Sequence, residues 1–405
     1  MLAKFILMRV AHIKLFTPIA SVALLSALSM SNAWAIEECQ LNKESVSPAN
    51  GSTTAGKTGI MQCRDKDSGK LLREQELRAG VFMGLLRYYK DGVLYKEYSV
   101  NERGNRDGKA REFAPSGQVV REENYVNSNS RGLQREWYPN GVVRRISFIG
   151  DAPKEKASVR YTPDKQLAEL ECADKPLLAP HVNDAALCGF QSKPSVVQLF
   201  NDSGRLKSQF NLVAGVSQQS TYFHENGKPD TTEELTAKQR IRKIYSDTGV
   251  LRKETIWNVT EKPAVLEREV EYHESGAKLR EQIFAISEKD GRKQNRLQTE
   301  ASFYLNGQSK SVEKFSFDGK EESKETRRYF DNGQLASTGR YILDGRYSSR
   351  AVGVHQSFSQ SGKLLSESFY DDKGRIQRER LLDESGKVLT DDLLFEDGSR
   401  KAYAK

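Results

Sequence analysis

One short pattern recurs along most of this chain. A tripeptide ends in glycine, and a large side chain stands four residues before that glycine. Trp137 stands four residues before Gly141, and Tyr329 stands four residues before Gly333. Asn-Gly, Asp-Gly and Ser-Gly pairs supply the positive φ angles that tight hairpin turns require. Tandem units of this kind stack on their neighbours rather than around one central core, so they constrain the fold more than any other feature.

The recurring positions define expected turns and an expected repeat core. The expected turn glycines are Gly92, Gly117, Gly141, Gly204, Gly227, Gly249, Gly276, Gly307, Gly333, Gly362, Gly374 and Gly386. The side chains expected to form the repeat core are Tyr88, Phe113, Trp137, Phe200, Phe223, Tyr245, Tyr272, Phe303, Tyr329, Phe358 and Tyr370. We assign these aromatics to packing rather than to ligand stacking, because a single hairpin is marginal and stacked hairpins need a shared apolar stripe.

The residues after each glycine read as strands. Leu251 and Trp257 follow Gly249 at offsets of two and eight residues, and both offsets are even. Side chains at even spacing in a strand point to one face, so both are expected on the same face. We expect the charged residues between them to face solvent or to pair across strands. The sequence predicts an all-β protein, an elongated array of antiparallel hairpins that forms a long curved sheet.

At this point the repeats resemble a known family. Gly132-Leu-Gln-Arg-Glu-Trp137-Tyr-Pro-Asn-Gly141 and Arg328-Tyr329-Phe-Asp-Asn-Gly333 look like the variant MORN repeat of bacteria, which also defines the YwqK-type antitoxin family. The resemblance covers roughly residues 60 to 150 and 197 to 400. It implies successive antiparallel hairpins, binding to a protein or a membrane surface, and no catalysis. It also implies immunity against a partner toxin.

The first 35 residues have the three parts of a secretory signal peptide. They contain three basic residues and no acidic residue, an apolar stretch over 15–30, and a final Ala-Trp-Ala. Cleavage near Ala35 would deliver the chain to the periplasm or outside the cell. An uncleaved anchor is less favoured, because the apolar stretch is shorter than the roughly 20 residues that span a bilayer. Either Met1 or Met8 could be the start.

Cysteine use and charge narrow the possible partners. In an oxidising compartment, Cys39–Cys63 and Cys172–Cys188 are the predicted disulfides, and each typically stabilises by about 3 kcal/mol. A metal site is disfavoured, because Cys-x-x-Cys spacing is absent and histidine is scarce. The net charge of +8 becomes 8 − 3 = +5 once the signal peptide is removed. This mildly basic, well-mixed composition predicts no nucleic-acid partner.

Several motifs imitate catalytic or metal sites without their structural context. Residues 51–58 match a phosphate-binding loop, but polar residues precede them and Gly59 follows, so the necessary strand and helix are missing. Ser311 and Lys314 match a Ser-x-x-Lys motif, yet they fall inside an expected strand. Asp65 begins a faint calcium-loop pattern, which we interpret as a turn aspartate. We therefore expect no catalytic residue, no cofactor and no metal.

His224 and His273 occupy the same turn-entry position in their copies, three residues before the glycine, and are expected to be exposed. The chain divides into a signal peptide (1–35), a polar lead-in (36–61), hairpin repeats (62–167), a disulfide-stapled insertion (168–196) and further repeats (197–405).

Lys165 is expected to replace the turn glycine in one copy. The predicted function is a non-enzymatic exported scaffold that binds another protein, with an antitoxin-like role as one form. A module that binds anionic lipid or glycan of the cell envelope is the alternative.

Overall fold

The computed structural model describes residues 37–152, 154–289, 292–317, 321–345 and 348–403. The predicted signal peptide lies outside the described residues. Within those residues the chain is almost entirely β-strand, with one 3-10 turn, η1 (Gly51–Thr53), and one short helix, α1 (Asp184–Leu187). None of the helical segments in these ranges is long and apolar enough to cross a membrane.

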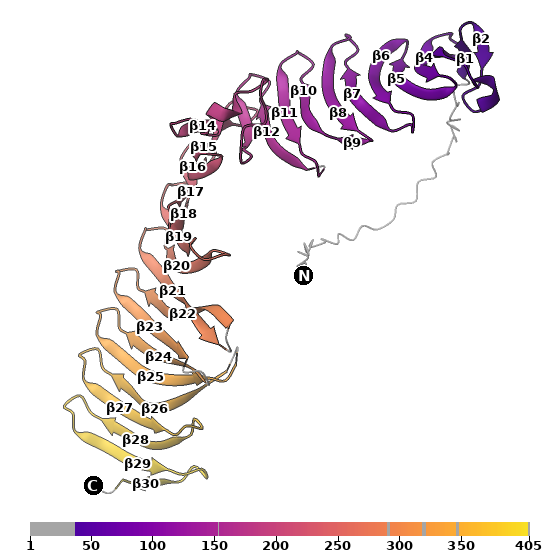
Figure 1. Ribbon diagram of the computed structural model, residues 1–405. Coiled ribbons are helices and arrows are strands. Elements are labelled where there is room, and N and C mark those ends of the chain that lie inside the picture. Colours follow the sequence, from indigo (N-terminus) through magenta and orange to yellow (C-terminus); the bar gives the residue numbers. More distant parts are fainter. Residues whose placement is uncertain (1–36, 153, 290–291, 318–320, 346–347, 404–405) are drawn as a thin grey trace, which may run out of the picture.

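The strands form two sheets that follow one another along an open arc (Figure 1). The first sheet contains β1 (Glu37–Leu41), β2 (Glu44–Val46), β3 (Gly59–Asp65), β4 (Leu71–Arg78), β5 (Val81–Lys90), β6 (Val93–Val100), β7 (Arg106–Phe113), β8 (Val119–Val126), β9 (Asn129–Ser130), β10 (Gly132–Trp137), β11 (Val143–Ile149), β12 (Glu155–Tyr161) and β13 (Leu167–Glu171).

The second sheet contains β14 (Ser195–Phe200), β15 (Leu206–Val213), β16 (Val216–Phe223), β17 (Pro229–Leu235), β18 (Gln239–Tyr245), β19 (Leu251–Asn258), β20 (Val265–Tyr272), β21 (Lys278–Lys289), β22 (Arg292–Phe303), β23 (Ser309–Phe317), β24 (Glu322–Tyr329), β25 (Leu335–Leu343), β26 (Ser349–Phe358), β27 (Leu364–Tyr370), β28 (Ile376–Leu382), β29 (Val388–Leu394) and β30 (Arg400–Ala402). Nearly every strand pairs antiparallel with its neighbours in sequence. The all-β repeat array is confirmed, although it forms two hydrogen-bonded sheets rather than one.

The repeat turns are three-residue loops closed by glycine. At Gly141, for example, the glycine N–H donates to the carbonyl of Tyr138, and the N–H of Tyr138 donates to the carbonyl of Val142. All twelve expected turn glycines have positive φ, from +78° at Gly204 to +91° at Gly249. A type I turn followed by a left-handed residue is a common hairpin loop of this length, and glycine adopts that conformation without steric cost.

Next to these turns the strand register shifts by one residue. Tyr245 faces Leu251 across the hairpin, whereas Ile244 faces Lys253, so an extra residue is accommodated between them. Residues paired across two strands share a face of the sheet, and successive residues along a strand alternate between faces. The extra residue of this β-bulge therefore exchanges the faces of all side chains that follow it in the strand. Leu251 and Trp257 therefore lie on opposite faces. The expectation that both lie on one face was wrong.

The sheet thus carries two sets of aromatic side chains. We call the aromatics four residues before the turn glycines the turn stripe, with Tyr245 as its example. We call those eight residues after the glycines the far stripe, on the opposite face; it comprises Tyr125, Trp257, Phe284, Phe315, Tyr341 and Tyr370. Tyr370 also stands four residues before Gly374, but it belongs to the far stripe and not to the turn stripe, because its ring and the ring of Tyr341 both contact the ring of His355.

Tyr88 departs from the expected pattern. It pairs with Lys96, whereas Tyr89 pairs with Leu94 next to the turn. The cause is the turn itself, in which both Asp91 and Gly92 have positive φ and only two residues form the loop. A loop one residue shorter moves the neighbouring side chain to the other face. Tyr89, rather than Tyr88, occupies the turn-stripe position in this copy.

None of the eleven aromatics expected to form the repeat core is fully buried. Each is half-buried, because most of the array is a single layer of strands. Buried apolar side chains concentrate at two places instead. One cluster lies at the N-terminal end and contains Cys39, Leu41, Val46, Met61, Cys63 and Leu77. This cluster closes the N-terminal end of the array.

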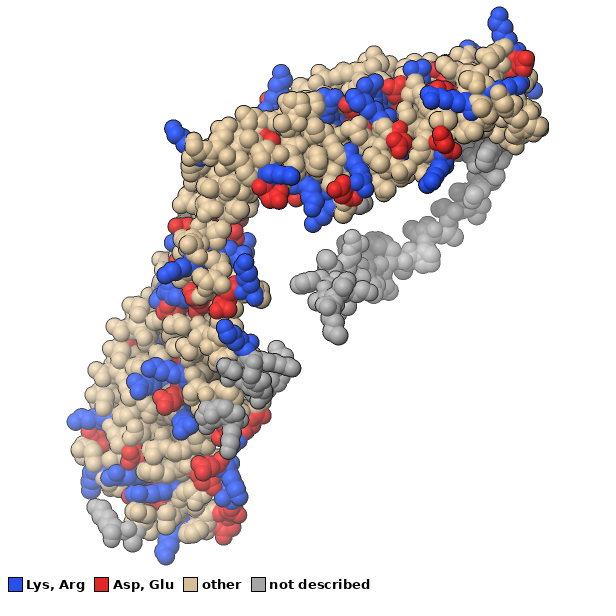
Figure 2. Space-filling view, in the orientation of Figure 1, with Lys and Arg blue, Asp and Glu red and all other residues tan. Residues whose placement is uncertain are grey.

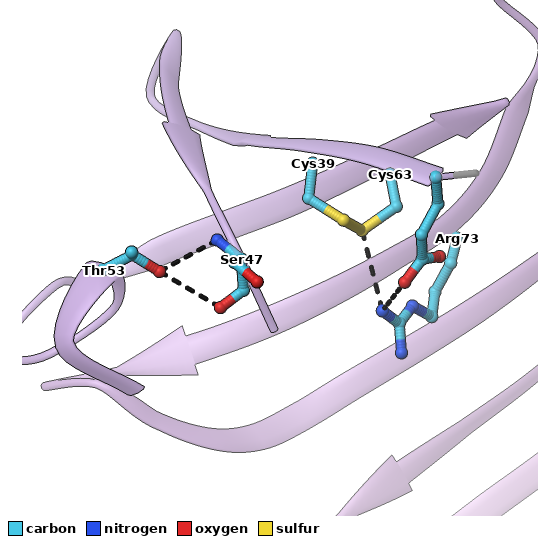
Figure 3. The surroundings of a disulfide bond; sticks show 6 residues. Cys39, Ser47, Thr53, Cys63 and Arg73 are labelled. Atoms are coloured by element: carbon cyan, nitrogen blue, oxygen red, sulfur yellow. Dashed lines mark hydrogen bonds and ion pairs between the residues drawn. A yellow bond between two sulfur atoms is a disulfide. The ribbon is translucent and has the colours of Figure 1, made fainter. Parts of the chain in front are cut away.

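The described part of the lead-in, residues 37–61, belongs to this N-terminal cluster rather than preceding the fold. Its β1 and β2 extend the first sheet, and the Cys39–Cys63 disulfide joins β1 to β3 (Figure 3). Thr53 Oγ1 accepts from the backbone N–H of Ser47 at 2.8 Å and so ties η1 to the end of β2. An edge covered in this way is protected against pairing with other chains.

The second cluster lies at the junction of the two sheets. The insertion between β13 and β14 carries α1, and its Leu178 and Val182 pack against Ile146, Ala157 and Val159 of the first sheet. The Cys172–Cys188 disulfide closes the insertion as predicted. An ion pair between Arg160 of β12 and Asp202, at 3.0 Å, also crosses the junction. The insertion thus separates the two sheets and supplies side chains to a second buried cluster.

Candidate binding surface

The repeat turns are occupied by contacts between neighbouring repeats. The hydroxyl of Tyr138 donates to the carbonyl of Tyr161 at 3.0 Å, and that of Tyr304 donates to the carbonyl of Tyr329 at 2.9 Å. The ring of His224 makes the same contact, with Nε2 at 3.1 Å from the next turn-stripe carbonyl. His224 is therefore half-buried rather than exposed, because its ring links two repeats.

Turn asparagines extend these links. The side-chain amide of Asn226 donates to the carbonyl of Asp247 at 2.7 Å. That of Asn306 donates to the carbonyl of Asp331, also at 2.7 Å. The turn edge is consequently a hydrogen-bonded ladder that holds repeats in register. Its polar groups are used within the fold, which leaves few of them to recognise a ligand.

A row of alternating charges crosses the middle of the first sheet, on the face of the turn stripe. Neighbouring members pair across strands at 2.7 to 3.4 Å. The row runs through Glu74, Arg87, Glu97, Arg111, Glu122 and Arg135. Opposite charges facing each other across a sheet stabilise strand pairing. Three acids and three arginines cancel, so this row is a structural feature rather than a site for a charged partner.

The acid Glu122 illustrates the energetics of the row. Partial burial alone would raise its pKa, but hydrogen bonds from Arg135 and Arg111 outweigh burial and lower it. Figure 2 shows the same mixing of basic and acidic side chains over the visible face of the molecule. On this visible face neither sign of charge gathers into a large patch.

Cations lie over aromatic rings on the far-stripe face, as they also do on the turn-stripe face, where Arg135 lies 5.1 Å from the ring centroid of Trp137. Arg240 lies 4.4 Å from the ring centroid of Trp257, and Lys324 lies 5.9 Å from that of Tyr341. Arg106 lies 4.5 Å from the ring centroid of Tyr98 and 5.5 Å from that of Tyr125. Cation–π contacts of this type orient charged side chains against aromatic rings.

Two hollows open among these side chains. The first, which we call the Arg106 hollow, measures about 450 Å³ and is lined by Gln75, Phe82, Leu86, Tyr98, Val100, Gly104, Arg106, Tyr125 and Ser128. The second, the Phe317 hollow, measures about 570 Å³ and includes Arg296, Leu297, Phe315, Phe317, Glu322 and Leu343. Both have the size and the mixed apolar and polar lining of sites that hold side chains or small ligands.

The Arg106 hollow has an unusual charge balance. Burial alone would lower the pKa of Arg106, but the hydroxyls of Tyr125 and Tyr98 outweigh it and raise the pKa, so the guanidinium stays charged. Burial and contact with Tyr98 raise the pKa of Tyr88 to about 12, so this hydroxyl behind Tyr98 stays neutral. No carboxylate of the described residues forms an ion pair with Arg106. In the Phe317 hollow, by contrast, Arg296 pairs with Glu322 at 2.6 Å.

The residues of the motifs that resemble enzyme or metal sites make local structural contacts in turns and strands. Residues 51–53 form η1 with Asn50 as its cap. The hydroxyl of Ser311 pairs with that of Ser302 across two strands at 2.7 Å. The carboxylate of Asp65 accepts from the N–H and hydroxyl of Ser68 within a turn.

The described residues contain one group of three possible metal ligands, Glu37, Cys39 and Cys63, and its two sulfurs are joined in a disulfide.

The two hollows were not predicted from the sequence. The offset of eight residues places Tyr125 and Phe315 in the far stripe, but it gives no reason to single out Arg106 or Arg296. The sequence pattern does not reveal the β-bulge, which places the far stripe on the face opposite the turn stripe. Once the face is known, a basic residue at the start of the adjacent strand becomes recognisable as a neighbour of the ring.

Comparison with known proteins gives one family. A family model described as the MORN repeat variant matches residues 106–127 and 351–372. The first match includes Arg106 and Tyr125. No curated protein matches the chain.

Similar solved structures include a crystal structure of TcdB2-TccC3-Cdc42, with 9% identity over 86% of this chain and 20% of that chain, at a TM-score of 0.17. They also include the Photorhabdus luminescens Tc holotoxin pore, with 11% identity over 84% of this chain and 18% of that chain, at a TM-score of 0.14. The chain thus spans about a fifth of these proteins, and scores this low carry no argument about it. What the comparisons establish is a protein with the MORN repeat variant at two places, one in each of its sheets.

Proposed function

We propose that this protein is a non-enzymatic exported scaffold that binds another protein through its far-stripe face. The observation that carries the proposal is the pair of hollows on that face, both lined by aromatic rings and arginine. Tyrosine, tryptophan and arginine are the side chains that contribute most to protein–protein affinity. Repeat arrays commonly offer long curved surfaces of this kind to a partner.

Export is supported by the signal-peptide pattern of the sequence and by two disulfides. Disulfides persist in oxidising compartments such as the periplasm. An antitoxin-like role rests on the resemblance to the YwqK-type repeats, and it would require a toxin that acts in the same compartment.

A protein partner accounts better for the charges than an anionic lipid surface does. Membrane-surface binding needs clustered basic side chains without acidic partners. On this protein most arginines of the sheets face a carboxylate within 4.0 Å, as Arg111 faces Glu97 and Glu122. A surface whose charges are already paired favours a partner recognised by shape and aromatic contact.

Site-specific photo-crosslinking in the producing cell tests the proposal. A photoreactive amino acid at Trp257 or Tyr341 on the far stripe should yield a discrete crosslinked protein. The same amino acid at Tyr245 or Tyr329 on the turn stripe is the matched control and should yield none. Crosslinks that form only from the turn stripe, or only to lipid, would refute the assignment.

The second step uses the captured protein in purified form. Replacing Trp257 by alanine should weaken binding by roughly thirty-fold, which corresponds to about 2 kcal/mol for a central aromatic contact. Replacing Tyr245 by alanine should leave the affinity within about two-fold of the original, because this ring is not at the proposed interface.

A further inference from the structure

We propose that the Arg106 hollow binds a carboxylate that is carried beside an apolar side chain, as at the free C-terminus of a peptide that ends in an apolar residue. The inference rests on the proposed function for the nature of the ligand, a protein segment. It is otherwise argued from the side chains that line the hollow.

The first argument is the unbalanced charge of Arg106. Arg87 of β5 and Arg111, which lies in β7 with Arg106, each face carboxylates, at distances between 3.0 and 3.4 Å. Arg106 has aromatic rings as neighbours instead, and no acidic side chain within the described chain forms an ion pair with it. A guanidinium has five N–H donors in a plane and binds a carboxylate in a bidentate manner. An incoming carboxylate would supply the acceptor that its neighbours already have.

The second argument is the apolar wall beside that charge. Phe82, Leu86 and Val100 line the hollow together with the rings of Tyr98 and Tyr125. A volume of about 450 Å³ accommodates a large apolar side chain as well as the carboxylate. Because the apolar lining and the cation are adjacent, the ligand must carry its anion close to its apolar group. The last residue of a peptide has this arrangement.

The third argument concerns the polar groups of the wall, which are already engaged. Gln75 donates its amide to the carbonyl of Glu76 at 3.1 Å. The hydroxyl of Ser128 accepts from the backbone N–H of Arg106 at 3.2 Å. A sugar ring would bring several hydroxyls that find few free partners here, and burying unpaired polar groups is costly. The lining therefore favours one anion and an apolar group over a glycan.

The Phe317 hollow does not share this inference. Its arginine, Arg296, pairs with Glu322 at 2.6 Å and lies 4.6 Å from the ring centroid of Phe317. An added carboxylate would compete with one already present. Selectivity for a free carboxylate is thus assigned to the hollow of the first sheet alone.

The test titrates the purified, disulfide-intact chain with a fluorescent peptide, acetyl-Gly-Ser-Gly-Ser-Phe with a free C-terminus. The comparison peptide is identical but ends in an amide. We expect saturable binding of the acid and at least about tenfold weaker binding of the amide, because a charge-assisted hydrogen bond is lost. Equal binding of both peptides, or no saturable binding of the acid, would overturn the proposal.

Three variants locate the effect. Arg106→Gln should lose at least about tenfold in affinity for the acid peptide, and Arg106→Lys should fall between it and the parent, because lysine keeps the charge without the planar fork. Arg240→Gln removes a similar cation from the ring of Trp257, outside the hollow, and should bind as the parent does. If Arg106→Gln and the parent bind the acid peptide with equal affinity, the peptide binds elsewhere and the proposal is refuted. Circular dichroism and thermal unfolding establish that each variant is folded.

The outcome separates this inference from the proposed function. If far-stripe crosslinks to a protein persist while the acid peptide fails to bind, the scaffold role stands and the carboxylate site is refuted. If the acid peptide binds but far-stripe crosslinks are absent, the site stands and the extended interface is refuted. A glucuronate-bearing oligosaccharide that binds more tightly than the peptide would refute the peptide assignment.

Discussion

At the scale of single residues, glycine is required in this chain for two different reasons. Gly227 has a φ of +81°, and an added Cβ would meet no atom within 4 Å, so only its backbone conformation demands glycine. Gly189 has a φ of +69°, and an added Cβ would lie 2.1 Å from the carbonyl oxygen of Leu212 at the junction of the sheets. The first position tolerates substitution with strain, whereas the second also excludes any side chain.

This difference predicts unequal costs of alanine. Gly227→Ala should lower the free energy of unfolding by about 1 to 2 kcal/mol, the cost of a left-handed residue with a side chain. Gly189→Ala should cost clearly more, because the backbone of β15 must also move. Denaturant unfolding of the two variants measures both values. A Gly189→Ala variant as stable as Gly227→Ala would contradict the close approach.

The row of paired charges leads to a second prediction, which concerns the dependence of stability on pH. The pKa of Glu122 is lowered from its ordinary value of 4.5, because hydrogen bonds from Arg135 and Arg111 outweigh burial. A carboxyl with a depressed pKa in the folded state contributes stability above the unfolded value, and this contribution is lost as pH falls through the folded value. Stability should therefore decline below about pH 4.5, and less steeply in Glu122→Gln. The measurement is the unfolding midpoint between pH 3 and 7; identical slopes would exclude a role for this carboxylate.

At the scale of elements, the hairpin was predictable and its bulge was not. A pair such as Asn-Gly indicates a positive φ angle from the local sequence alone, so the turn at Gly333 could be predicted from the sequence. The bulge depends on how one strand registers against its partner, and Leu251 and Trp257 keep an even spacing whether or not it is present. Tyr88 was misplaced for the same reason, since a two-residue loop and a three-residue loop differ by one residue of register.

The insertion is the element whose disulfide matters most for the joined sheets. Replacing Cys172 and Cys188 by serine should lower stability by about 3 kcal/mol, the typical value for a loop of this size. Limited proteolysis should then cut within residues 172–194, where the parent resists. The matched control replaces Cys39 and Cys63, which should loosen the N-terminal end and leave the insertion protected. Cleavage at the insertion in the control alone would reverse the assignment.

At the scale of the whole molecule, stability is unevenly distributed. Buried apolar clusters lie at the N-terminal end and at the junction, whereas β28, β29 and β30 contain no fully buried residue. Each repeat in such an array is stabilised mainly by its neighbours, so the end without a core should open first.

Hydrogen exchange measures this gradient. Amides of β11 to β15 should exchange most slowly, and those of β28 to β30 most rapidly. Removing residues 375–405 should leave the slow exchange at the junction unchanged, because distant repeats do not contact it. Uniform protection along the chain, or loss of protection at the junction after truncation, would show that the array unfolds as one unit.

The class of fold, the turns and the disulfide pairs could be derived from the amino-acid sequence, because each depends on local residue types or short spacings. The face that each aromatic occupies, the division of the array into two sheets, and the position of Arg106 between Tyr98 and Tyr125 became visible only in the folded chain. Those properties depend on register between strands, and a shift of one residue exchanges the two faces without changing composition or period.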